Sequence, residues 1–165
     1  MLPLSRSGAL IIVWAVTMTT AAAQQSADPE AQSPAPTMAQ HLVDEFVRTH
    51  KLVSAVELAL DSAGTCKTFG ATDRSDVGLP CDADEKGPMR TGKPDIAKPT
   101  QADPVYDITQ ALHDTSGHLI GAVGMDIPPA PGQDEAAVLS VAQGLLRKLE
   151  AQIPSKEWLF QPARQ

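Results

Sequence analysis

Basic side chains are scarce in this sequence of 165 residues, which has 13 lysine and arginine residues against 20 aspartate and glutamate residues and a net charge of −7. Binding to nucleic acid or to an anionic membrane surface needs clustered lysine and arginine side chains. The charge balance therefore speaks against both classes of partner.

Long hydrophobic runs are absent after residue 23. Before it, Arg6 precedes an apolar run over residues 9–18, and three small residues end at Ala23. This pattern predicts a secretory signal peptide over residues 1–23, and therefore an exported protein, periplasmic or extracellular. An uncleaved membrane anchor is the alternative, although the apolar run is shorter than the roughly 20 residues that a spanning helix needs. Residues 24–36 are rich in Pro, Ala, Ser and Gln and predict a flexible leader.

Cysteine is limited to two residues, Cys66 and Cys81. In an exported protein such a pair most simply forms one disulfide, which would stabilise the fold by about 3 kcal/mol for a loop of this length. A redox pair or a metal site is the alternative. The pair lacks C-x-x-C spacing and has no nearby histidine, which disfavours both.

Catalytic signatures are also absent, since no G-x-S-x-G, H-E-x-x-H or phosphate-loop motif occurs. His41 and His50 are expected on opposite sides of one helix, where they cannot share a metal ion. His113 and His118 flank a predicted turn, which is typical of solvated histidines. The sequence therefore predicts a protein that is not an enzyme and has no metal or cofactor.

Apolar spacing and capping residues predict the order of the elements. Thr37 and Gln40 form a capping-box pattern at the start of a helix, and Gly64 is a stop signal after it. In chain order we expect a helix to about residue 62, a short strand over 65–73, a long polar loop over 74–98, a hairpin over 104–127 and a helix over 134–153.

This order predicts an α+β fold, with a small antiparallel sheet and helices packed against it, in one domain over residues 37–153. The long loop has room for one or two further strands. The C-terminal tail over residues 154–165 contains Trp158, Leu159 and Phe160, and we expect these three to fold back on the domain.

The hairpin has a turn signal at Asp114 to Gly117, because Asp favours the first position of such a turn and Gly the last. Two further glycines, Gly121 and Gly124, lie in its second strand. Glycine weakens a strand, so each predicts close approach by another backbone or by a ligand. A plain core hairpin that packs on a helix is the alternative.

The register of this hairpin suggests a binding surface. A three-residue loop pairs Asp114 with His118 and places Tyr106, Gln110 and Asp126 on one face, beside the space left by Gly124. A phenol, an amide and a carboxylate around a gap are suited to a small polar ligand, with Asp126 accepting from an amine. A four-residue loop would instead place Tyr106 opposite Met125, or this face would pack on a helix.

Three segments together resemble the Cache family of extracellular sensor domains, which are PAS-like in fold. They are ATDRSDVGLP over residues 71–80, MRTGKP over 89–94 and YDITQALHDTSGHLIGAVGMDI over 106–127. The resemblance implies an antiparallel PAS-like sheet with a long N-terminal helix. It also implies a pocket over the sheet that binds an amino acid, an amine or a carboxylate.

By this resemblance Asp126 and Tyr106 are expected pocket residues, and Arg90 is expected to pair with a ligand carboxylate. Family members usually lie between membrane helices, whereas no second membrane segment or output module is evident in this sequence. We therefore expect a single exported module that acts through a membrane-bound signalling or transport partner. A structural or interaction protein of the same fold without a ligand, or a metal or redox protein, is the alternative.

Overall fold

The computed structural model describes residues 36–163. The predicted signal peptide, residues 24–35 of the predicted leader, and residues 164 and 165 lie outside the described residues. In chain order the elements are α1 (Met38–Thr49), β1 (Ala55–Ser62), β2 (Thr65–Ala71), η1 (Arg74–Asp76), α2 (Ala83–Thr91), β3 (Asp95–Ala97), β4 (Tyr106–His113), β5 (Leu119–Ile127), α3 (Glu135–Glu150) and α4 (Lys156–Leu159).

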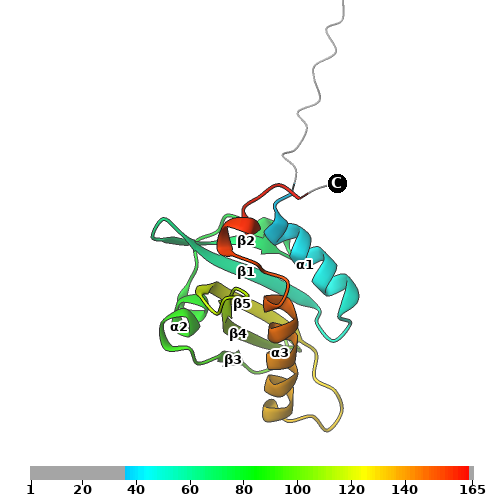
Figure 1. The fold of residues 1–165 in the computed structure, drawn as a ribbon. Coiled ribbons are helices and arrows are strands. Elements are labelled where there is room, and N and C mark those ends of the chain that lie inside the picture. Colours follow the sequence, from blue (N-terminus) through cyan, green and yellow to red (C-terminus); the bar gives the residue numbers. More distant parts are fainter. Residues whose placement is uncertain (1–35, 164–165) are drawn as a thin grey trace, which may run out of the picture. The chain divides into compact units, whose positions relative to one another are not determined.

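The five strands form one antiparallel sheet in the order β2-β1-β5-β4-β3 (Figure 1). Helices α1 and α3 pack on one face of this sheet, and the large buried side chains gather there. Helix α2 packs on the other face, over a smaller buried cluster that includes Ala59 and Ala122. The predicted α+β class, an antiparallel sheet with an N-terminal and a C-terminal helix in a PAS-like arrangement, is confirmed.

The first helix is shorter than predicted. Helix α1 starts where expected, with the Thr37 hydroxyl accepting from the backbone N–H of Gln40 at 3.3 Å, but it ends at Thr49. Residues 55–62, expected to be helical, form β1 between β2 and β5. This strand is covered on both faces, with Leu58 and Leu60 buried on one side and Ala59 on the other. A strand buried on both faces loses the alternating pattern that distinguishes it from a helix.

The long loop expected over residues 74–98 contains three elements, η1, α2 and β3. A local signal for α2 is present in the sequence, because Asp82 and Glu85 form a capping box. The Asp82 carboxylate accepts from Asp84 N–H at 2.8 Å, and Glu85 accepts from Asp82 N–H at 2.7 Å. Pro88 inside the helix obscures this signal, since proline normally disfavours a helix interior.

The C-terminal residues belong to the folded domain. Leu159 of α4 is fully buried, and the Phe160 ring meets the Phe69 ring edge-on at 4.7 Å between centroids. Ala163 N–H donates to the carbonyl of Pro36 at 2.7 Å, so the two ends of the described chain lie together. None of the helices in residues 36–163 is long and apolar enough to cross a bilayer.

The hairpin of β4 and β5 forms as predicted, but its register changes partway along. Asp114 N–H donates to the carbonyl of His118 at 3.0 Å, and His113 lies opposite Leu119, as expected. A β-bulge follows, so that Leu112 faces Gly121 instead of Ile120. One extra residue on β5 shifts all later pairs by one, so each later side chain of β5 lies on the opposite face, relative to β4, from the one predicted. The predicted register beyond this point was therefore wrong.

The two glycines in β5 differ in what surrounds them, and the predicted close approach of a backbone is confirmed for Gly121. A Cβ atom on Gly121 would lie 2.0 Å from the carbonyl oxygen of Ala59, so this glycine permits close approach of the β1 backbone. A Cβ atom on Gly124 would have nothing nearer than Thr109 Oγ1 at 3.6 Å. Gly124 therefore leaves open space on the face that α2 covers.

Candidate functional site: an acidic cleft

A cleft of about 370 Å³ lies over the open space at Gly124. Nine of its fifteen lining residues are acidic, and none is lysine, arginine or histidine. Three of the acids come from the sheet: Glu57, Asp107 and Asp126. The other six come from the segment after β2, from the start of α2 and from the loop before β4: Asp73, Asp76, Asp82, Asp84, Glu85 and Asp103. We call this site the acidic cleft.

The floor of the acidic cleft is formed by the pairing of β1, β5 and β4. Asp107 lies directly opposite Asp126, and Gly124 lies between Glu57 on one side and Thr109 on the other. Directly opposed residues have Cβ atoms about 4.5–5.5 Å apart, so the Asp107 and Asp126 side chains are neighbours on the floor. Two acids in this position repel each other unless a proton or a cation intervenes.

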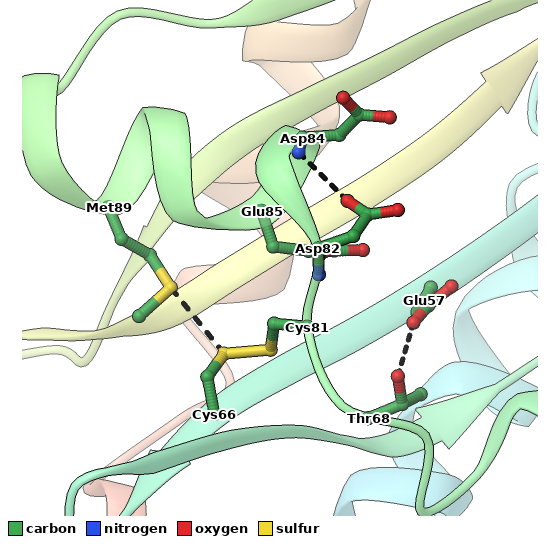
Figure 2. Close-up of a disulfide and its surroundings, with 8 residues drawn as sticks. All are labelled: Glu57, Cys66, Thr68, Cys81, Asp82, Asp84, Glu85 and Met89. Carbon is green, nitrogen blue, oxygen red and sulfur yellow. Dashed lines mark hydrogen bonds between the residues drawn. A yellow bond between two sulfur atoms is a disulfide. The ribbon is translucent and has the colours of Figure 1, made fainter.

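The wall of the cleft is held by the disulfide and by α2. Cys66 on β2 and Cys81 form the predicted disulfide, with 5.3 Å between their Cα atoms. Figure 2 shows Cys81 leading directly into Asp82 and the N-terminal turn of α2. Met89 on the same helix lies with its Sδ atom 3.8 Å from Cys66 Sγ. The disulfide thus anchors the start of the helix that carries Asp84 and Glu85.

The carboxylates of the cleft have no cationic partner among residues 36–163, because no ion pair found there includes one of them. Arg74 follows Asp73 in sequence, but its guanidinium binds both oxygens of Asp44 at 2.9 and 2.7 Å. Burial, followed by repulsion from nearby carboxylates, raises the pKa of Asp107 to about 6. The same two causes raise the pKa of Asp126.

Glu57 is held in place by Thr68, whose hydroxyl donates to its carboxylate (Figure 2). Thr68 lies on β2 and is buried. Burial raises the pKa of Glu57, and the hydrogen bond from Thr68 opposes this by favouring the charged form. Glu57 is therefore a positioned acceptor at the β1 side of the floor.

The pKa of Asp107 predicts how stability depends on pH. The folded state binds a proton at Asp107 more tightly than the unfolded state, so its contribution is present below the ordinary pKa of 3.8 and is lost as pH rises through about 6. The full effect corresponds to about 3 kcal/mol, which solvent screening reduces to about 1–2 kcal/mol. The acids that repel its charge are Asp126, Asp84, Asp103 and Asp95.

We expect the free energy of unfolding of the ligand-free protein to increase as the pH falls from 7.5 to 5. In Asp107→Asn this dependence on pH should be weaker. Urea unfolding at several pH values measures both effects. The window stays above pH 5 because the pKa values of Glu45, Asp73 and Asp114 are lowered, and these groups lose stabilising charge only in more acidic solution. A pH dependence that is unchanged in Asp107→Asn would contradict the assignment.

The structure does not bring the four predicted binding residues together. Asp126 lines the acidic cleft. Tyr106 packs against the buried cluster under α1 and α3, and Gln110 is buried beside a separate cavity of about 210 Å³ next to α3. The prediction that these three residues share a face was wrong, because the bulge at Leu112 places Asp126 on the opposite face. Arg90 is exposed in the last turn of α2 and does not line the cleft.

Sequence reasoning missed Glu57, Asp107 and Thr109 as floor residues. Asp107 and Thr109 alternate with apolar Ile108 and buried Gln110, which is the signal of a strand with one polar face. Glu57 lay in a segment expected to be helical, so the face of the sheet on which its side chain lies was not predicted. Among residues 36–163 no group of three or more metal-ligand side chains is arranged to hold a metal ion.

No protein-family model matches the sequence, and no curated protein matches it significantly. Solved structures with similar backbones include the GAF domain of a two-component sensor histidine kinase from Bacillus halodurans, with 10% identity and a TM-score of 0.49 over 68% of this chain and 91% of that one. A putative GAF sensor protein from Burkholderia vietnamiensis has 17% identity and a TM-score of 0.47 over 74% and 81%.

A type II free methionine-R-sulfoxide reductase from Thermoplasma acidophilum is a third similar structure, with 14% identity and a TM-score of 0.40 over 71% of this chain and 92% of that one. These proteins include both sensors and an enzyme. Their low identities and TM-scores transfer no function to this chain, and the fold assignment rests on its own sheet and helices.

Proposed function

We propose that this protein is a small-ligand binding module whose acidic cleft takes an organic cation carrying an amine. The observation that supports this most directly is the lining of the cleft, where nine carboxylates surround about 370 Å³ and no basic side chain is present. An ammonium group would offset the negative charge of several carboxylates and donate hydrogen bonds to them.

The electrostatics of the free cleft favour the same ligand. Carboxylates whose pKa values are raised by burial and mutual repulsion destabilise the folded state at neutral pH. A bound cation would reduce this repulsion, and the reduction would contribute part of the binding free energy. Of the three ligand classes expected from the sequence, the amine fits this lining, whereas a ligand carboxylate would face only like charges.

The resemblance to the Cache family supplies the biological setting of the proposal. In that setting the module is exported, is not an enzyme, and passes on the presence of its ligand through a membrane-bound signalling or transport partner. A structural or interaction protein with the same fold is the competing function, and it predicts that no small molecule changes the stability of the protein.

Asp126→Ala tests the proposed site. We expect the wild-type protein to be stabilised by a primary amine and this stabilisation to be lost in the variant, because Asp126 belongs to the carboxylate pair on the floor. Thermal unfolding with and without the amine measures the effect. We expect affinity to fall at least about tenfold while the free protein stays folded.

The matched control is Glu45→Gln, which also removes one negative charge but lies on α1, outside the cleft, in an exposed pair with Arg48. It should leave amine binding unchanged if the site is specific. Equal losses in Asp126→Ala and Glu45→Gln would indicate general charge attraction. Unchanged binding in Asp126→Ala would remove this residue from the site, and no stabilisation by any amine in the wild-type protein would refute the proposed function.

A further inference from the structure

Seven of the nine carboxylates of the acidic cleft are arranged around two residues of its floor, Glu57 and Asp107. Asp76 and Asp82 repel charge on Glu57, and we call these three residues the Glu57 group. Asp84 and Asp103 repel charge on Asp107, and these three residues are the Asp107 group. Asp126 acts on both Glu57 and Asp107, so it lies between the two groups.

The sheet sets the separation of the two groups. Glu57 is on β1 and Asp107 is on β4, with β5 between them. Glu57 pairs with Gly124 and Asp107 pairs with Asp126, two residues further along β5. With neighbouring strands about 4.8 Å apart and a rise of about 3.4 Å per residue, their Cα atoms are roughly 12 Å apart. One ammonium group in direct contact with Asp107 would therefore leave the Glu57 group without a partner.

The space between the groups is shaped to receive a ligand. Gly124 leaves the floor open there, and the neighbouring Thr109 is only 5% exposed. Within residues 36–163 the Thr109 hydroxyl makes no hydrogen bond, and it borders the cleft instead of being enclosed in the core. It faces the floor beside Gly124, where a Cβ atom would lie 3.6 Å from it. This free hydroxyl is a hydrogen-bonding group available to a ligand in addition to the acids.

The lining of the acidic cleft also includes small apolar side chains. Ala55 and Ala71 border the cleft beside the acids of the sheet. A methylene chain can pack against such methyl groups without leaving a polar atom unpaired. The cleft thus combines two anionic groups with small apolar side chains, Ala55 beside Asp126 and Ala71 beside Glu57.

We propose that the ligand of the acidic cleft is a linear diamine or polyamine, with one ammonium group at the Glu57 group and a second at the Asp107 and Asp126 pair. This inference rests on the proposed function and names the ligand class for the same site. The connecting methylene chain lies over Gly124, and the Thr109 hydroxyl accepts from an N–H of the ligand.

Calorimetric titration of the full-length protein with a matched set of amines tests the inference. The probes are 1,4-diaminobutane, spermidine, n-butylamine and magnesium chloride, all at the same ionic strength. We expect 1,4-diaminobutane or spermidine to bind at least about tenfold more tightly than n-butylamine, because only the dications engage both groups. Magnesium should bind more weakly than either, since a compact ion cannot span the two groups.

The outcomes separate the inference from the proposed function. Equal affinity for n-butylamine and for both polyvalent amines would overturn the inference and leave amine binding intact. Magnesium binding as tightly as the diamine would overturn it by showing simple charge attraction. Failure of every amine to bind would overturn both proposals.

Two variants test the division into groups within one protein. Glu57→Gln and Asp107→Asn each remove charge from one group, and both reduce repulsion in the free cleft, so folded protein is expected. Each variant should reduce the preference for 1,4-diaminobutane over n-butylamine to within about threefold. Glu45→Gln, outside the cleft, should keep the wild-type preference. A preference that is unchanged in both cleft variants would overturn the assignment of the two groups.

Discussion

Gly121→Ala is expected to prevent the native sheet from forming. The added Cβ atom would lie 2.0 Å from the carbonyl oxygen of Ala59, and 3.1 Å from the Ala59 carbonyl carbon and the Leu60 Cα atom. These are backbone atoms of a central strand, which cannot rotate away as a flexible side chain can. We expect the free energy of unfolding to fall by more than about 3 kcal/mol, beyond the usual effect of overpacking a core.

Gly124→Ala is the matched control on the same strand. Its Cβ atom would meet Thr109 Oγ1 at 3.6 Å, an ordinary contact, so we expect the free energy of unfolding to change by less than about 1 kcal/mol. The same methyl group would fill the floor of the acidic cleft and weaken amine binding. Urea unfolding of both variants, with a thermal-shift assay of Gly124→Ala, measures these effects. Equal destabilisation by the two substitutions would contradict the packing described here.

The double variant Cys66→Ala with Cys81→Ala is expected to be the next most destabilised. The disulfide closes a loop with a sequence separation of 15, and such a loop is worth about 3 kcal/mol in the chain-entropy description. Urea unfolding measures the loss. The control is reductant, which should lower the stability of the wild-type protein to that of the variant and leave the variant unchanged. A variant as stable as the oxidised wild type would refute the structural role of the bond.

The same double variant should also bind amines more weakly. Cys81 directly precedes Asp82, which caps α2, and the disulfide holds this point against β2. Without it, Asp82 and Asp84 lose their fixed distance from the floor of the cleft, so affinity should decrease even at temperatures where the variant is folded. Calorimetric titration well below the unfolding midpoint separates this effect from the loss of stability.

Local signals predicted the elements that depend on few residues. The turn at Asp114 forms because its carboxylate accepts from the N–H groups of Ser116 and His118, at 2.9 and 3.0 Å, and Gly117 adopts a positive φ of 79°. The helix over residues 134–153 was close to α3, since Asp134 caps it as a local side-chain interaction. Both features are set by contacts within a few residues along the chain.

Elements that depend on distant contacts were predicted less well. Residues 55–62 have apolar spacing compatible with a helix, and they become β1 because β2 and β5 pair with both of their edges. The bulge beside Leu112 has no clear local signal, yet it decides which face every later side chain of the hairpin occupies. A shift of one residue exchanges the two faces of a strand, so a small error in register moved Tyr106 and Asp126 apart.

The sequence by itself determined the excess of acids, the disulfide pair, the hairpin turn and the absence of catalytic motifs, because these are properties of composition or of short segments. Only the tertiary structure decided that nine acids from β1, β4, β5, η1, α2 and the connecting loops surround one cleft. The physical reason is that Glu57 and Asp126, far apart along the chain, become neighbours only through strand pairing across the sheet. The repulsion that a cationic ligand would relieve therefore exists only in the folded protein.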